Sequence, residues 1–223
     1  MPLNKSKGNM YEWTTHTFNT CKGICPHMCH YCYCKAWGPQ KPIRFDEKEL
    51  KTDLGKFNTI FIGSSCDLFA DEIPGEWIQK TIDHCKKFPL NSYLFQSKNP
   101  KRMFELRSIF PSGSLFGTTI ETNRQYDQMG RAPLIVYRVK YMGLLGVTRK
   151  TMVTLEPIMD FDIKELVSMI EHIRPTWVNI GADSKGHGLP EPSADKILAL
   201  IDELKKFTEI KQKKNLSRLL NGK

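Results

Sequence analysis

The sequence of 223 residues lacks three features, each of which would indicate a particular class of protein. It has no apolar run near the roughly 20 residues that a membrane span requires. Its N-terminal residues lack the apolar core of a secretory signal, so we expect a reducing, cytoplasmic location. No internal repeat or low-complexity segment is visible. These absences favour an ordinary globular protein, which the hydrophobic share of 40% also indicates.

The length fits a single domain with one sizeable core. The net charge is +9, and the end of the chain is visibly basic, with seven Lys or Arg residues after position 204 against one acidic residue, Glu209. We predict a core over residues 1–207 and a basic C-terminal tail over residues 208–223. Such a tail can hold a polyanion, although a charged tail is more often a solvated surface.

Cysteine is present in an odd number, seven, and four of these residues lie between positions 25 and 34. This crowding indicates metal chemistry rather than a disulfide framework. The residues at 25–32 read CPHMCHYC, a C-x3-C-x2-C spacing. Iron in a [4Fe-4S] cluster is normally held by four cysteine thiolates, so three cysteines leave one coordination position open.

A structural zinc site is the alternative interpretation, because C-x2-C pairs are also common zinc ligands. No second C-x2-C and no C…H-x3-H pattern follows in the chain. Four nearby side chains can nevertheless each complete a zinc site: His27, His30, Cys21 and Cys34. The sequence therefore leaves both metals open and favours the cluster.

With an aromatic residue, Tyr31, directly before the last cysteine, the motif resembles that of the radical SAM superfamily. The resemblance implies that Cys25, Cys29 and Cys32 hold a [4Fe-4S] cluster and that S-adenosylmethionine (SAM) binds the open iron. It further implies reductive cleavage of SAM to a 5′-deoxyadenosyl radical, which abstracts hydrogen from a substrate. Tyr31 is then expected to pack near the adenine. An electron donor such as flavodoxin or ferredoxin is implied as a partner.

Six apolar runs alternate with predicted helices along the chain. The predicted strands are residues 12–19, 59–63, 92–96, 114–121, 151–156 and 177–182. Such alternation predicts a parallel sheet with right-handed crossovers, and a three-layer doubly wound sheet also fits. The resemblance implies instead a single-domain α/β fold, a partial (β/α)6 TIM-type barrel of six parallel strands. In either fold, functional residues are expected at the C-terminal ends of the strands.

Polar residues follow these strands, and five of them are candidates for binding SAM. Ser64 and Ser65 come after the second strand, where radical SAM enzymes receive the amino group of SAM. Lys98, after the third strand, can pair with the SAM carboxylate through a charge-assisted hydrogen bond. Glu121 can accept the ribose hydroxyls, and Glu156 ends the fifth strand. Each of these positions also suits an ordinary turn or cap residue.

Three short segments resemble the spore photoproduct lyase family, whose members are radical SAM enzymes that repair a thymine dimer in DNA. They are the residues CHYCY at 29–33, SC at 65–66 and SK at 97–98. The resemblance implies that Cys66 donates hydrogen and that Tyr33 takes part in radical relay. A thiol is a good hydrogen-atom donor to a carbon radical, but a lone free cysteine is more often a small buried hydrophobe.

More of the chain is similar to a phage-associated radical SAM-like family whose genes often neighbour a three-Cys-motif partner protein. The similar segments are EWT at 12–14, DLF at 67–69, IPGEW at 73–77, SKNPK at 97–101 and GTTIE at 117–121. Typical members have a longer gap between the first two cysteines than this chain has. The resemblance implies a three-Cys-motif protein as a partner and places the chain in the cytoplasm of a bacterium, an archaeon or a phage-infected cell.

From these observations we predict a radical SAM enzyme of the lyase or modification type. The basic surface and the lyase resemblance favour a nucleobase or nucleotide as its substrate, in repair-type or modification-type chemistry. Two alternatives stay open. One is a non-catalytic zinc-binding nucleic-acid adaptor, and the other is an iron-sulfur redox sensor that does not cleave SAM.

Overall fold

A computed structural model describes residues 2–8 and 10–221 of the chain. Its main sheet has eight strands in the order β1-β2-β5-β6-β7-β8-β9-β10. The short β1 (Asn4–Lys5) is antiparallel to β2 (His16–Phe18), and all the other neighbours are parallel. The parallel strands that follow β2 are β5 (Thr59–Ile62), β6 (Ser92–Gln96), β7 (Ser114–Thr119), β8 (Lys150–Leu155), β9 (Trp177–Ile180) and β10 (Glu209–Gln212).

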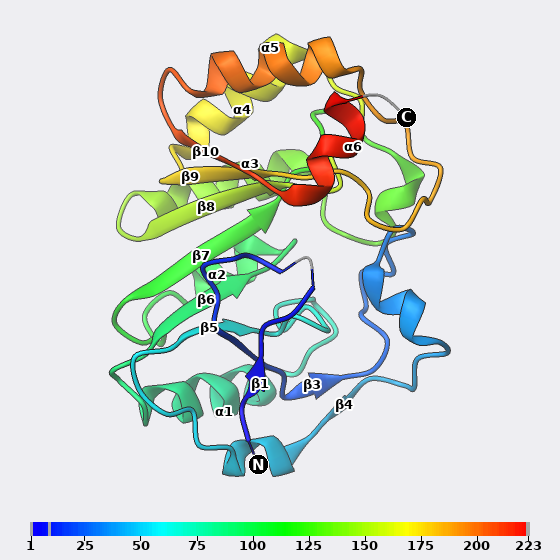
Figure 1. The fold of residues 1–223 in the computed structure, drawn as a ribbon. Helices are drawn as coiled ribbons and strands as arrows, with labels where there is room; N and C mark the ends of the chain where they lie inside the picture. Colours follow the sequence, from blue (N-terminus) through cyan, green and yellow to red (C-terminus); the bar gives the residue numbers. More distant parts are fainter. Residues whose placement is uncertain (1, 9, 222–223) are drawn as a thin grey trace.

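Helices connect the parallel strands and cover the outer face of the sheet (Figure 1). They are α1 (Gly75–Lys86), α2 (Pro100–Glu105), α3 (Ile135–Gly146), α4 (Ile163–Ile173) and α5 (Ala194–Leu204). Each strand points alternate side chains to the two faces of the sheet, so in β5 Ile60 and Ile62 join the main core under the helices and Phe61 does not. None of the helices in the described ranges is both long and apolar enough to cross a membrane.

The inner face of the curved sheet is covered by the N-terminal segment instead of by helices. Tyr11 packs there against Phe61, Leu94 and Met152, which come from three different strands. Its ring stacks on Trp13 with the centroids 5.2 Å apart. Figure 1 shows this dark blue segment in front of the middle strands. The hollow of the partial barrel is therefore partly filled by the chain itself.

A small lobe beside the sheet carries the cysteine loop. It contains a two-stranded antiparallel ribbon, β3 (Cys21–Lys22) with β4 (Arg44–Phe45), and the 3-10 turns η1 (Tyr33–Trp37) and η2 (Glu47–Lys51). A further 3-10 turn, η3 (Asp127–Met129), lies between β7 and α3. The loop that holds the three motif cysteines leaves β3 and ends at η1.

The predicted fold class is confirmed, and the six predicted strands correspond to β2 and β5–β9. The predicted number of strands is wrong, because β10 adds a seventh parallel strand and β1 an antiparallel one. The residues of β10 are EIKQ, an edge strand too polar to produce a hydrophobic pattern. It lies in the stretch predicted as a basic tail and is followed by η4 (Lys214–Leu216) and α6 (Ser217–Leu220). Gly222 and Lys223, the end of that stretch, lie outside the described residues.

Candidate functional site

The cysteine loop is held in place by a turn from a distant part of the chain. The Arg131 backbone N–H donates to the His27 carbonyl at 2.7 Å, and the His30 N–H donates to the Gln128 carbonyl at 2.8 Å. Gly130 lies between these contacts with φ +64°, and a Cβ there would meet the His27 carbonyl oxygen at 2.4 Å. The close approach of the two backbones thus requires glycine at this position.

Two of the three motif thiols have a lowered pKa, and in each case the cause is a second cysteine. A hydrogen bond from the Cys66 thiol lowers the pKa of Cys25 to about 7. The corresponding contact with Cys34 lowers the pKa of Cys32 to about 6. Burial raises the pKa of Cys29. Because the thiolate is the metal-binding form of cysteine, Cys25 and Cys32 are poised to bind near neutral pH.

This donor set fits a [4Fe-4S] cluster with one open iron. All three sulfurs come from free thiols on one loop, with Cys29 buried and Cys25 and Cys32 half-buried. Cysteine thiolates are the usual ligands of such clusters, and hydrogen bonds to the ligating sulfurs tune them. Within residues 2–8 and 10–221, no three His, Cys, Asp or Glu side chains are grouped so as to hold a single metal ion.

A buried carboxylate, Asp67, ties the cysteine loop to two strand ends. Its Oδ2 atom accepts from His27 Nε2 at 2.8 Å, from the Ser97 hydroxyl at 2.9 Å and from the Lys98 backbone N–H at 2.8 Å. Its Oδ1 atom accepts from the Phe69 N–H at 2.9 Å. Burial by itself raises the pKa of Asp67, but His27 and these donors bring it below its ordinary value. Asp67 therefore joins the turn after β5, the loop after β6 and the cysteine loop.

A second buried network surrounds Glu121, directly after β7. Its Oε1 atom accepts from the Tyr31 hydroxyl and from the Lys98 ammonium, and its Oε2 atom accepts from Arg138 Nη1 at 2.9 Å. The Lys98 ammonium also lies 4.9 Å from the centre of the Tyr31 ring. Glu121 and Arg138 are 0% exposed. Burial acts to raise the pKa of Glu121, but the charges of Lys98 and Arg138 outweigh it and lower this pKa to about 2.

The structure thus brings together three of the candidates, Tyr31, Lys98 and Glu121, beside the cysteine loop. Both carboxylate oxygens of Glu121 are engaged by protein donors, so its predicted contact with a ribose requires Lys98 to turn away and stays a prediction. Arg138 was not singled out from the sequence. A signal for it exists, because Arg138 shares the buried face of α3 with Ile135 and Met142, where a charge is unusual.

The two candidate serines hold the residues that follow the third motif cysteine. The Tyr33 hydroxyl donates to the Ser64 carbonyl, and the Cys34 thiol donates to the Ser65 carbonyl at 3.4 Å. The Asn19 side chain bonds the Ser64 hydroxyl at 3.2 Å and accepts from the Ser65 N–H at 3.0 Å. Asn19, which ends the first predicted strand, was missed because a polar residue after a strand is common.

Glu156 lies elsewhere, with the segment that follows β10. Its carboxylate accepts from Lys213 Nζ at 2.7 Å and from Asn215 Nδ2 at 2.9 Å. A Cβ on Gly181 would meet a Glu156 oxygen at 2.8 Å, so the two strand ends are tightly packed. No pattern in the sequence predicts the contacts of Glu156 with Lys213 and Asn215, which lie 57 and 59 residues further along the chain.

Comparisons with known proteins bear on the fold. No family model matches the chain, and no curated protein matches it by sequence. A solved structure of a spore photoproduct lyase variant with bound AdoMet and dinucleoside spore photoproduct matches with a TM-score of 0.61 and 13% identity, over 90% of this chain and 64% of that chain. A tyrosine-to-phenylalanine variant of the lyase matches with a TM-score of 0.60 and 14% identity, over 93% and 66% of the two chains. The chain spans about two thirds of these lyases and shares their fold.

Proposed function

We propose that the protein is a radical SAM enzyme that acts on a nucleobase or nucleotide. One observation carries the proposal: a single loop at the C-terminal edge of a parallel partial barrel presents three free thiols, two of them with near-neutral pKa values. The likeness of the fold to spore photoproduct lyase supports it. So does the position of Lys98 and Tyr31, whose contact with Glu121 lies beside the same loop.

Cys25, Cys29 and Cys32 would hold the [4Fe-4S] cluster. A bound cluster would supply the one-electron reduction of SAM to the 5′-deoxyadenosyl radical, with the electron coming from a donor such as flavodoxin or ferredoxin. Lys98 is a suitable partner for the SAM carboxylate, since its side chain is 15% exposed while that of its neighbour Glu121 is not exposed. Tyr31 would then lie near the adenine. In this proposal Ser64 and Ser65 receive the amino group, and Glu156 is a further candidate for binding the cofactor.

Cys66 is the proposed source of the hydrogen atom returned to the product. Its S–H bond would break as a C–H bond forms on the substrate radical, which leaves a thiyl radical on Cys66. The phenol of Tyr33 would then give up its hydrogen atom to restore the thiol, which leaves a tyrosyl radical. One electron from the flavodoxin- or ferredoxin-type donor and one proton from solvent would restore the phenol. Cys66 is 2% exposed and contacts Cys25, and Tyr33 contacts the turn that carries Cys66, so both lie at the cluster loop.

The choice of substrate follows from two supports. One solved lyase structure is complexed with dinucleoside spore photoproduct, and the present chain carries a net charge of +9. Two further parts of the prediction remain to be tested. They are the reaction type, lyase or modification, and the three-Cys-motif partner protein that the phage-associated resemblance implies. Both depend on radical formation, which is tested first.

The test is anaerobic reconstitution of the full chain with iron and sulfide, followed by metal analysis and by product analysis with SAM and dithionite. We expect about four irons per chain and formation of 5′-deoxyadenosine, both lost in Cys29→Ala. The matched control is Cys85→Ala, which removes a buried thiol of α1 and should retain both. Stoichiometric zinc without SAM cleavage would favour the nucleic-acid adaptor, and a cluster without 5′-deoxyadenosine would favour the redox sensor. Either result contradicts the proposal.

A further inference from the structure

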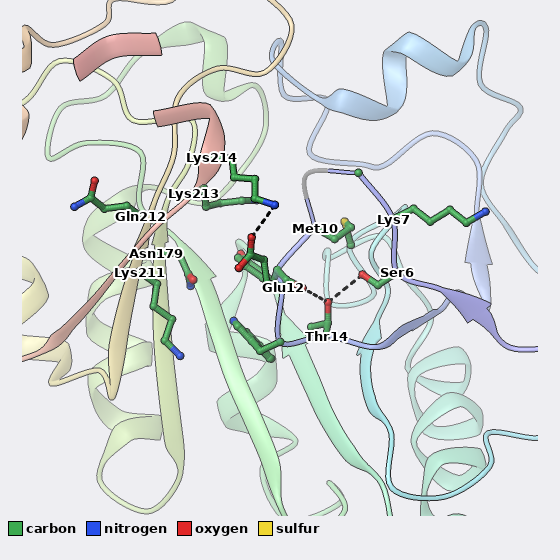
Figure 2. A pocket seen from close by; sticks show the side chains of 13 residues that line it. Ser6, Lys7, Met10, Glu12, Thr14, Asn179, Lys211, Gln212, Lys213 and Lys214 are labelled. Carbon is green, nitrogen blue, oxygen red and sulfur yellow. Dashed lines mark hydrogen bonds and ion pairs between the residues drawn. The ribbon is translucent and has the colours of Figure 1, made fainter. Parts of the chain in front are cut away.

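A cavity of about 370 Å³ lies between the N-terminal segment and the last two strands of the sheet, β9 and β10. One wall is the N-terminal segment, residues 6–8 and 10–14, and the other is Asn179 of β9 with residues 211–214. We call this place the seam; Figure 2 shows it from close by. The volume lies in the range of small-molecule sites, which begins at roughly 300 Å³.

The charge of the seam suits an anion. Four lysines line the cavity, Lys7, Lys211, Lys213 and Lys214, against a single acidic lining residue, Glu12. Two carboxylates outside the lining also pair with these lysines, Glu209 with Lys211 at 3.6 Å and Glu156 with Lys213 at 2.7 Å, so the positive charges exceed the negative ones by one. Lys211 Nζ lies 4.2 Å from the centre of the Trp177 ring, and the Lys211 side chain remains 35% exposed. A lysine ammonium has only donors to offer, so the cavity favours a ligand rich in acceptor oxygens.

Two indole N–H groups at the seam have no hydrogen-bond partner. Trp13 belongs to the N-terminal wall and lines the cavity, whereas Trp177, in β9, lies outside the lining; their rings meet edge-on with the centroids 5.3 Å apart. The Nε1 atom of each is buried, and neither finds an acceptor in the described part of the chain. Buried donors are nearly always satisfied in native structures, so two adjacent exceptions require an explanation. An acceptor-bearing ligand supplies one.

A weak contact closes the seam. Lys214 Nζ lies 3.2 Å from the Glu12 carboxylate, and the two side chains are 90% and 79% exposed. Figure 2 shows this ion pair bridging the two walls. Exposed ion pairs contribute little free energy, so this pair can break at small cost, while the Trp13–Trp177 contact still joins the two walls. Loss of the ion pair widens the access of a ligand to the cavity, whose lining includes Trp13.

We propose that the seam binds the phosphate of a nucleotide. The phosphate oxygens accept from Lys211 and Lys214 and, once the Lys214–Glu12 ion pair is broken, from the indole N–H groups of Trp13 and Trp177. Tyr11 lines the same cavity, and its hydroxyl donates to Gln96 at the end of β6. The seam therefore leads to the C-terminal edge of the sheet. The choice of a nucleotide over another phosphate ester rests on the proposed function.

The test is calorimetric titration of the full chain with uridine and thymidine 5′-monophosphates, in excess SAM so that the SAM site is occupied. We expect both to bind, with affinity that falls as salt rises, and the phosphate-free nucleosides to bind about tenfold more weakly or worse. A single-stranded tetranucleotide that binds much more tightly would support the proposal and assign the phosphate to a nucleic-acid strand. The proposal would be overturned if the nucleosides bind as tightly as the monophosphates, or if inorganic phosphate alone binds as tightly as the monophosphates.

Four variants make the test specific to the seam. Lys211→Gln should weaken nucleotide binding about tenfold, and Trp177→Phe, which keeps an aromatic ring but removes the N–H, should weaken it several-fold. Glu12→Gln should strengthen binding several-fold, because it removes both the closing ion pair and a negative charge. Lys205→Gln, an exposed lysine that follows α5, is the control and should change nothing. Equal effects of Lys211→Gln and Lys205→Gln, or weaker binding in Glu12→Gln, would refute the proposal.

This experiment can be told apart from the test of radical chemistry because no reductant is present. Nucleotide binding without 5′-deoxyadenosine formation in the earlier test would leave the seam proposal standing while the enzyme proposal falls. Production of 5′-deoxyadenosine by a chain that binds no nucleotide would leave the enzyme proposal standing while the seam proposal falls.

Discussion

The cysteine-loop region and the seam are built in opposite ways. Around the loop, the buried charges of Glu121 and Asp67 each accept from several donors on different elements. At the seam, the ion pair between Lys214 and Glu12 has side chains 90% and 79% exposed, and the buried indole N–H groups of Trp13 and Trp177 find no acceptor in the described residues. Buried, multiply bonded charges hold a fixed geometry, whereas an exposed pair holds almost none. The difference fits the two proposed roles, a preorganised reaction site and an entrance for a ligand.

The largest effect is expected from Glu121→Gln, which breaks the buried network while keeping the shape of the side chain. Arg138 is 0% exposed and would be left without its charge partner. Removing one partner of a buried ion pair typically costs about 3–5 kcal/mol of the free energy of unfolding. Urea denaturation of the two proteins measures the loss. A loss below about 1 kcal/mol would show that this buried network stabilises the cysteine-loop region no more than an exposed ion pair would.

The pH dependence of stability tests the same carboxylate without relying on a change of shape. The pKa of Glu121 is about 2 in the folded protein and near ~4.3 in an unfolded chain. The unfolded state therefore binds more protons between these values, and the stabilisation present above pH ~4.3 is lost as the pH falls towards the folded pKa. From pH 5 to 3, the wild-type protein should lose about 2 kcal/mol more than Glu121→Gln. If the free energy of unfolding of the two proteins falls equally between pH 5 and 3, the lowered pKa of Glu121 is contradicted.

Two glycine substitutions separate backbone strain from the close contact at the cysteine loop. Gly130→Ala places a Cβ 2.4 Å from the His27 carbonyl oxygen, whereas Gly113→Ala, at a φ of +77°, meets nothing within 4 Å. Both variants carry the conformational cost of a positive φ, about 1–2 kcal/mol, and the ψ of −133° at Gly130 adds to it there. The clash should make Gly130→Ala less stable by at least about 1 kcal/mol more, and should reduce iron loading. Equal stabilities and equal iron contents would mean that the turn does not position the loop.

The smallest effect is expected from Lys214→Gln at the seam. Because the Lys214–Glu12 pair is exposed on both sides, its loss should change the free energy of unfolding by no more than about 0.5 kcal/mol. Urea denaturation beside Glu121→Gln provides the direct contrast. A loss of several kcal/mol would show that the seam is held shut as firmly as the cysteine loop, and the two regions would no longer differ in kind.

Much of the fold could be predicted because its signals are local. The strand at β5 is a run of four residues, TIFI, and the helix α4 places Leu166, Ile170 and Ile173 on one face within eleven residues. The strand β10 could not be predicted, since its EIKQ residues pair with β9 only because a parallel edge is available there. Tyr31 was predicted within the cysteine motif, and Lys98 and Glu121 at the ends of two separate strands, but the sequence did not predict the contacts among them.

The sequence by itself determined the candidate metal ligands of the loop, since Cys25, Cys29 and Cys32 lie within eight residues and no folding is needed to see their spacing. It also determined the alternation of strands and helices. Only the tertiary structure decided which charges are buried together and which rings meet. Trp13 and Trp177 are brought into contact because the N-terminal segment crosses the inner face of the sheet and meets the start of β9 there. Such contacts depend on how the elements pack, and no periodicity along the chain records them.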